Sequence, residues 1–189
     1  MKNIVLLLFA VSQISSSQIT PEIKLDLTPS SKVSFDDFKA LVNQVEAHRA
    51  QRLINLNDFL VMSKQENVII LDTRSDSRYN RKHIKGAIHL NFSDFTQEYL
   101  KQIIPDTNTR ILIYCNNNFD GDEINFASKI FIPKPTKEDK TRSLTLALNI
   151  PTYINLYGYG YKNVYELNEL ISFTDRRITY KGTTIINTK

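Results

Sequence analysis

The stretch from Val68 to Phe92, "VIILDTRSDSRYNRKHIKGAIHLNF", decides the fold. Its first four residues form a continuous apolar run, which is typical of a central parallel strand that is covered on both faces. Few apolar residues follow until Ala87 and Ile88, where Gly86 allows the turn into a second short strand. The stretch therefore predicts a buried strand, a polar connection and a return to the sheet.

Strand and helix patterns surround this stretch on both sides. A second apolar run, "TRILIY" at residues 109–114, leads directly into Cys115, and "KNVYEL" at residues 162–167 predicts one more strand. Ser34 begins an S-x-x-D capping pattern with Asp37. Helices are predicted over 35–49, over 58–64 with Asn57 as the cap, and over the turns from Phe95 to Pro105, with Ile54 on a short strand. This alternation predicts an α/β fold with a central, mainly parallel sheet flanked by helices.

The segment after Cys115 has a different pattern. "SLTLALNI" at residues 143–150 alternates strictly between apolar and polar or small residues, and "INFASKIFI" at residues 124–132 fits the same period. We therefore predict that residues 122–150 form an inserted hairpin, after which a helix capped by Thr152 resumes the domain. The tail "RITYKGTTII" predicts a further hairpin at the sheet edge, turning at Lys181 and Gly182.

Composition and charge indicate an ordinary globular protein. The chain has 189 residues, of which 41% are hydrophobic and 23% charged, so one domain with extensions is expected. The net charge of +4 comes from basic residues scattered along the chain, without a basic run of five or more. This distribution argues against nucleic acid as a partner.

Residues 1–17, "MKNIVLLLFAVSQISSS", have the layout of a cleavable secretory signal, and residues 18–33 follow as a polar linker. The apolar stretch from Ile4 to Val11 is too short to span a bilayer, so membrane association is not expected after cleavage. We predict a periplasmic or secreted protein. An uncleaved membrane anchor is the alternative.

Cys115 is the only cysteine, which excludes an intramolecular disulfide and a C-x-x-C redox motif. The three histidines do not share a ligand spacing, so no metal site is expected. A thiol at the carboxyl end of a parallel strand meets backbone N–H groups and helix N-termini, which stabilise a thiolate. Cys115 is therefore either a nucleophile or the last core residue of its strand.

The order of the motifs resembles the rhodanese-like domain of sulfurtransferases over residues 52–172, with a helix at 34–51 before it and a tail at 173–189 after it. That family has a strand ending in D-x-R, a G-H-I-x-G-A-like segment, a strand ending in the active-site cysteine and a final G-y-x-n-V-y-x-L element. The matching residues here are Asp72 and Arg74, His83, Ile84, Gly86 and Ala87, Cys115, and Gly160, Val164 and Leu167.

The resemblance implies that Cys115 accepts sulfane sulfur as a persulfide and passes it to a thiophilic acceptor. It also implies that the loop formed by Asn116, Asn117, Asn118 and Phe119 holds an anionic donor such as thiosulfate. No metal or organic cofactor is needed. The expected partners are a small sulfur donor, a thiol acceptor or a protein. Asp72 and Arg74 are expected to pair or to bond backbone groups that fix the loops, and His83 to order the loop before Gly86.

The loop departs from the family pattern because it carries Asp120, Asp122 and Glu123 but no cation. Carboxylates beside a thiol raise its pKa and repel thiosulfate. The alternative is therefore a non-catalytic binding module that presents the hairpin and the tyrosines at positions 157, 159 and 161. A phosphatase is disfavoured because Gly121 stands where Cys-x5-Arg requires arginine.

Overall fold

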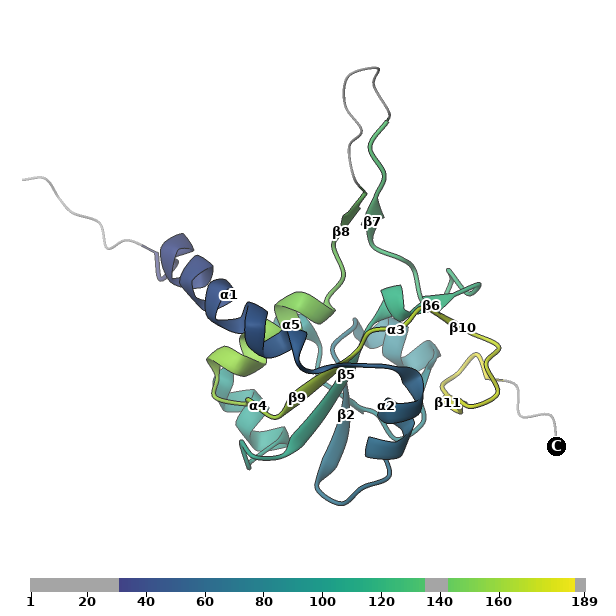
Figure 1. The fold of residues 1–189 in the computed structure, drawn as a ribbon. Coiled ribbons are helices and arrows are strands. Elements are labelled where there is room, and N and C mark those ends of the chain that lie inside the picture. The colour runs from purple at the N-terminus through teal and green to yellow at the C-terminus, as the bar shows by residue number, and fades with distance from the viewer. Residues whose placement is uncertain (1–30, 135–142, 186–189) are drawn as a thin grey trace, which may run out of the picture. The chain divides into compact units, whose positions relative to one another are not determined.

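A five-stranded parallel sheet forms the centre of the computed structural model, which describes residues 31–134 and 143–185 (Figure 1). The strand order is β1-β9-β5-β2-β4, and every neighbouring pair is parallel. The strands are β1 (Leu53–Ile54), β2 (Val68–Asp72), β4 (Ile88–His89), β5 (Arg110–Tyr114) and β9 (Val164–Leu167). The two apolar runs of the sequence are the central neighbours β2 and β5, as predicted.

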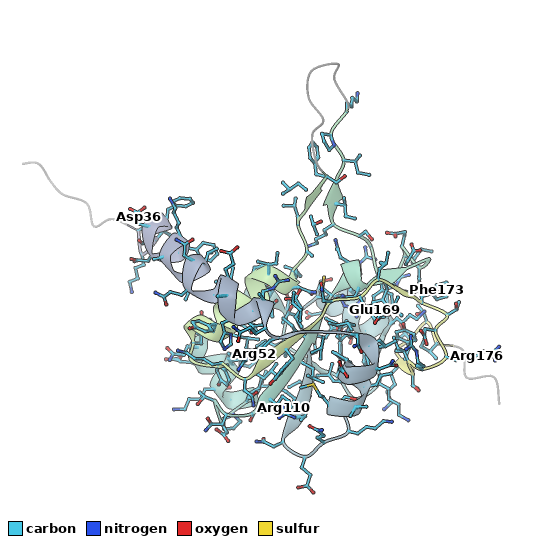
Figure 2. All side chains as sticks on the ribbon, viewed as in Figure 1. Asp36, Arg52, Arg110, Glu169, Phe173 and Arg176 are labelled. Carbon is cyan, nitrogen blue, oxygen red and sulfur yellow. The ribbon has the colours of Figure 1, made fainter. Side chains whose placement is uncertain are left out.

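Helices cover both faces of this sheet. They are α1 (Phe35–Ala50), α2 (Leu56–Met62), α3 (Asp76–Arg81), α4 (Gln97–Ile103) and α5 (Asn149–Gly158), with 3-10 turns η1 (Phe92–Asp94) and η2 (Asn116–Asn118). Ile111 and Ile113 of β5 join a core with residues of α1, α4 and α5, whereas Leu112 and Tyr114 join a second core with residues of α2. Strand side chains alternate between faces, so β5 is buried on both. Side chains fill the space between the sheet and its helices (Figure 2).

Two helix boundaries differ from the prediction. Asn55, not Asn57, caps α2, because its side chain accepts a hydrogen bond from the Asp58 amide at 2.9 Å. Helix α5 begins at Asn149, before the predicted cap Thr152. Ile150 and Ile154 then lie four residues apart on one face of the helix. The strand that the alternating pattern suggested therefore ends before Asn149. The Ser34 cap of α1 is confirmed, since its hydroxyl accepts from the Asp37 amide.

Three small sheets complete the structure. Strand β6 (Phe119–Asp120) pairs in parallel with β10 (Ile171–Ser172), β3 (His83–Ile84) pairs antiparallel with β11 (Tyr180–Lys181), and β7 (Ile130–Phe131) pairs antiparallel with β8 (Leu144–Thr145). The β7–β8 pair is much shorter than the alternating segments suggested. The predicted tail hairpin is wrong within the described residues, because β11 pairs with β3.

All of these elements belong to one compact unit that begins at Ser34. No helix among the described residues is long and apolar enough to cross a membrane. The predicted signal segment, residues 18–30 of the predicted linker, residues 135–142 of the predicted hairpin and residues 186–189 of the tail lie outside the described residues.

Candidate functional site

Cys115 lies at the carboxyl end of β5 with 2% of its surface exposed. The backbone groups of Asn117, Leu148 and Asn149 lie close enough to this thiol to lower its pKa. Asn117 belongs to the turn η2 that follows the cysteine, whereas Leu148 and Asn149 are at the start of α5. The two segments on either side of the hairpin therefore converge on one sulfur atom.

The surroundings of Cys115 act on its pKa in opposite directions. Burial is the largest influence and raises the pKa of the thiol, because a thiolate loses its hydration there. The amides of Asn117, Asn149 and Leu148 lower it, because they hydrogen-bond the charged form, and the charge of Glu166 raises it. The net pKa lies above that of a free thiol. The site thus combines backbone groups that lower the pKa of the thiol with a burial that raises it more.

The asparagine side chains that follow Cys115 build the loop itself. Asn118 accepts from the Cys115 amide at 2.9 Å and donates to the Leu167 carbonyl at 2.7 Å. Asn117 accepts from the Lys129 amide at 2.9 Å, and Asn116 lies 3.3 Å from a guanidinium nitrogen of Arg74. These three side chains therefore bond other parts of the domain.

Phe119 was expected to contact a substrate, and its position corrects that expectation. Its side chain is fully buried, with its ring centroid 4.3 Å from that of Phe126 and 5.9 Å from that of Tyr114. The residue belongs to strand β6 and to the core on the α2 side of the sheet. Its side chain therefore supports the end of the loop and is not placed to touch a ligand.

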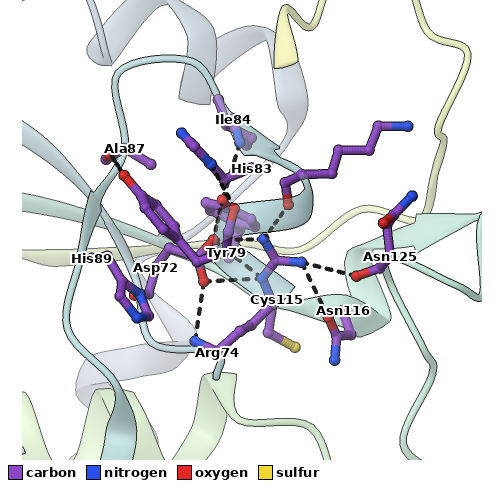
Figure 3. Close-up of polar contacts among 12 residues, drawn as sticks. Asp72, Arg74, Tyr79, His83, Ile84, Ala87, His89, Cys115, Asn116 and Asn125 are labelled. Atoms are coloured by element: carbon purple, nitrogen blue, oxygen red, sulfur yellow. Dashed lines mark hydrogen bonds and ion pairs between the residues drawn. The ribbon is translucent and has the colours of Figure 1, made fainter. Parts of the chain in front are cut away.

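Asp72 and Arg74 form the buried ion pair that was predicted for them (Figure 3). Arg74 Nη2 lies 2.7 Å from Asp72 Oδ2, and both side chains are almost fully buried. The same guanidinium donates to the carbonyl groups of Lys82 and Asn125 at 2.7 and 3.2 Å, and to Asn116. One arginine therefore joins the end of β2 to three loops around the cysteine, which is a structural role.

His83 orders its loop, as expected. Its Nδ1 lies 2.7 Å from the Tyr79 carbonyl oxygen, and its ring stacks on that of Tyr79 with centroids 3.9 Å apart. Gly86 has φ of +91°, a conformation that glycine adopts without strain. These contacts shape the connection from α3 to β4.

The carboxylate that acts on the thiol is not in the loop, which corrects the sequence-based expectation. Asp122 pairs with Lys82 at 2.8 Å, and Glu123 accepts from the Ser128 amide. The charge that raises the pKa of Cys115 belongs to Glu166, on β9. Sequence reasoning missed this residue.

Glu166 is 3% exposed and is held by side chains from two helices. Arg49 of α1 donates from Nε to Oε2 and from Nη2 to Oε1, both at 2.6 Å. Asn149 donates from Nδ2 to Glu166 Oε1 and to Asn118 Oδ1, both at 3.2 Å. An acidic residue within a predicted central strand was the available signal, because a buried carboxylate requires a partner.

The three tyrosines at the end of α5 and just after it pack within the domain. Tyr161 is buried and donates to the Ile104 carbonyl at 2.6 Å, and Tyr159 donates to the Phe95 carbonyl at 3.2 Å. Tyr157 packs edge-on against the ring of His48. These contacts favour the structural interpretation of the tyrosines over an exposed binding patch. Within residues 31–134 and 143–185, no cluster of three or more His, Cys, Asp or Glu residues could hold a metal ion.

Solved structures that are similar to this chain have 13–21% identity to it. A Bacillus halodurans protein covers 75% of this chain with 87% of its own length, at 17% identity and a TM-score of 0.47. An E. coli rhodanese determined with anions covers 61% of this chain with 99% of its own, at 17% identity and a TM-score of 0.37. A Pseudomonas aeruginosa thiosulfate sulfurtransferase covers 70% of this chain with 20% of its own, at 19% identity and a TM-score of 0.39.

No curated protein matches the chain. The family model described as the rhodanese-like domain matches residues 55–169, which is more than half of the sequence. The matched range runs from the cap of α2 to two residues beyond the end of β9 and includes the buried Asp72–Arg74 pair and Cys115. The chain therefore belongs to the rhodanese-like domain family.

Proposed function

We propose that this protein transfers sulfur through a persulfide on Cys115. The observation that carries the proposal is the place of Cys115 at the carboxyl end of β5, where the backbone groups of Asn117, Leu148 and Asn149 lower the pKa of its thiol. Preorganised N–H donors stabilise negative charge on a reacting atom without reorganisation during the reaction. A charged sulfur at this position, whether thiolate or persulfide, would receive that stabilisation.

The reaction with thiosulfate balances as two displacements. The Cys115 thiolate attacks the outer sulfur of the donor, a new S–S bond forms, the S–S bond of thiosulfate breaks, and sulfite leaves with the electron pair. The acceptor, a thiolate or cyanide, then attacks the outer sulfur of the persulfide, and the Cys115 thiolate leaves. The residues needed are a nucleophile and donors for its charge, without a redox cofactor.

Mass spectrometry of the intact protein tests this proposal. After incubation with thiosulfate, we expect a mass increase of one sulfur atom on Cys115, and loss of that sulfur as thiocyanate when cyanide is added. The Cys115→Ser variant is the matched control and should show neither. If the unmodified chain gains no sulfur from thiosulfate or from polysulfide, the catalytic proposal is wrong.

The second candidate function is a non-catalytic binding module on the same fold. It is favoured by the raised pKa and the burial of the thiol, together with Glu166 as the charge that acts on it. Alkylation kinetics discriminate between the two functions, because a nucleophile must react at neutral pH. Alkylation that is negligible until strongly alkaline pH, without a persulfide, would favour the binding module.

Export completes the proposed function and rests on residues 1–17. Expression of the full chain in a bacterial host should yield a protein shortened at its N-terminus outside the cytoplasm. N-terminal sequencing checks this. Recovery of the intact chain in the membrane fraction would favour the uncleaved anchor.

A further inference from the structure

A cavity opens at the amino ends of the central strands, at the opposite edge of the sheet from Cys115. Its volume is about 410 Å³. The lining residues are Arg52 before β1, Thr107 and Asn108 before β5, and Gly160, Lys162 and Asn163 before β9. These three strands are parallel, so their amino ends lie at one edge of the sheet. The cavity is therefore separate from the site around the thiol, which follows the carboxyl end of β5.

Hydrogen bonds within the protein hold the walls of this cavity. Asn163 Nδ2 donates to the Asn108 carbonyl at 3.0 Å, which joins two of the lining loops. The Arg52 carbonyl accepts from the Glu166 amide at 2.9 Å, which fixes the third. Asp106 is the carboxylate nearest to these loops in sequence, and its Oδ1 accepts from the Asn108 amide and from Asn108 Nδ2 at 2.8 and 3.1 Å. These bonds preform the cavity, and none of the described residues that line it carries a carboxylate.

Arg52 and Lys162 give the cavity its charge. Within the described part of the chain, neither forms an ion pair. The Arg52 guanidinium carbon lies 5.5 Å from the centroid of the Tyr165 ring, and Lys162 Nζ lies 4.7 Å from that of Tyr157. Arg52 Nε is buried and has no hydrogen-bond partner among the described residues. Contacts with ring faces hold the two cations in place but leave them without a counter-charge, so the cavity attracts anions.

His48 and Arg110 show that positive charge is concentrated at this edge. Burial lowers the pKa of His48 most, and the charges of Arg52 and Lys162 lower it further. The Arg110 guanidinium carbon lies 5.8 Å from the Tyr165 ring centroid, so this ring has two arginines beside it, both labelled in Figure 2. Like charges held this close repel one another, and a bound anion would relieve that repulsion.

An anion with several oxygen atoms fits these groups best. Guanidinium and ammonium groups bond the oxygens of phosphate and sulfate groups, and the Thr107 hydroxyl is a further donor. None of the lining residues has an apolar side chain, which argues against a ligand with a long hydrocarbon part. We propose that this cavity binds a phosphate or sulfate group, either as the free anion or on a small polar molecule. Such binding does not require the sulfur chemistry of Cys115, so either function can fail without the other.

His48 reports on this site, because an anion bound between Arg52 and Lys162 would offset the charges that lower its pKa. We would titrate the histidines of the full chain by NMR in sodium chloride and in sodium phosphate at equal ionic strength. The pKa of His48 should be higher in phosphate, whereas the His83 and His89 signals should follow the same curve in both salts. An identical His48 curve in both salts, or an equal change at all three histidines, would overturn the proposal.

Substitution of the two cations tests the position of the site. The His48 signal followed at fixed pH gives the affinity for phosphate, and Lys162→Gln should weaken it by about tenfold, because one charge-assisted hydrogen bond is lost. Lys162 is exposed, so this variant should remain folded. Arg52→Gln should weaken the affinity similarly, with circular dichroism to check its fold. Lys181→Gln is the matched control, since it removes an exposed cation on β11, and it should bind phosphate as the unmodified chain does. Equal affinities of Lys162→Gln and this control would contradict the assigned site.

Glucose 6-phosphate distinguishes the two sources of the group. The cavity lies within the range of about 300–1,000 Å³ that is typical of small-molecule sites, so it has room for more than the phosphate group. Tighter binding of glucose 6-phosphate than of inorganic phosphate would support a phosphorylated organic ligand. Equal binding of the two would support the free anion, and binding of neither would overturn the proposal.

Discussion

Replacing Glu166 by glutamine should lower the pKa of the Cys115 thiol, and replacing Arg49 by methionine should raise it. Glu166 is the charged residue that raises this pKa, and Arg49 neutralises it through two hydrogen bonds of 2.6 Å. Without the carboxylate, the partly buried guanidinium favours the thiolate. Without the guanidinium, the carboxylate acts on the thiol at full strength.

The size of the effect follows from the residue that lies between the two groups. The Asn149 backbone acts on the Cys115 thiol, and Nδ2 of the same residue lies 3.2 Å from Glu166 Oε1. For two charges about 9 Å apart, an effective dielectric constant of about 20 gives about 2 kcal/mol, or about 1.4 pKa units. Each single substitution should shift the pKa by about one unit, in opposite directions. The double variant should return close to the starting value.

The pH dependence of iodoacetamide alkylation measures this pKa directly, because Cys115 is the only thiol. Only the thiolate reacts, so the rate rises with pH through the pKa, and the Glu166→Gln curve should lie at lower pH. Arg177→Met is the matched control, since Arg177 also pairs with a carboxylate, that of Asp175, but at an exposed site. Circular dichroism confirms that each variant is folded. Shifts of both single variants in the same direction, or an equal shift of the control, would refute the electrostatic role of the pair.

Three further predictions concern stability and ionisation. Arg74→Met should cost about 3–5 kcal/mol of unfolding free energy in urea, because it leaves a buried carboxylate unpaired; a loss below about 1 kcal/mol would contradict the structural role given to Arg74. Gly182→Ala should destabilise the β11–β3 pairing, because the new Cβ would lie 2.2 Å from the Arg81 carbonyl oxygen at φ of +135°; unchanged amide exchange at β11 would count against it. The pKa of His48 should lie below 6.5, mainly because of burial and then because of Arg52, so NMR titration should show it rising in Arg52→Gln. Because the pKa of His48 is lowered in the folded state, the contribution of neutral His48 to folding stability should be lost as the pH falls below about 6.5.

The sequence predicted the fold correctly where a residue pattern is compatible with only one kind of secondary structure. Val68–Leu71 and Ile111–Tyr114 are solid apolar runs that suit strands buried on both faces. Ser34 could be predicted as the N-cap of α1, because a capping side chain bonds a backbone amide that is close to it in sequence. By contrast, "SLTLALNI" satisfies a strand period, although its last two residues, Asn149 and Ile150, belong to α5. Eight residues are too few to distinguish the period of a strand from that of a helix when the helix continues beyond them.

The candidate site was only partly predictable for a related reason. Cys115 could be located because its position depends on one strand and where that strand ends. Glu166 and Arg49 could not be assigned to the site, because their effect depends on β9 lying beside β5 and on α1 packing near both. The acidic loop residues were the nearest charges in sequence, but Asp122 is committed to Lys82. Reasoning from neighbours in the sequence therefore predicted the correct direction of the pKa shift of the thiol, but it assigned the shift to the wrong residue.

The backbone groups that act on the Cys115 thiol lie at the two ends of the segment that contains the hairpin. The chain leaves the site after Asn117, forms the hairpin, and returns at Leu148 and Asn149, whose backbone groups act on the thiol together with that of Asn117. An insertion at this place must therefore preserve the geometry of its two ends. Its length matters less, because a loop with fixed ends can be lengthened at little cost in free energy. The ends are fixed here by the bonds of Asn117 to Lys129 and of Asn149 to Glu166. The second of these bonds depends on the Glu166 carboxylate, which Arg49 of helix α1 holds in place. Helix α1 is therefore coupled to Cys115 through the C-terminal end of the insertion. Changes in the hairpin and changes in α1 should both alter the properties of the same thiol.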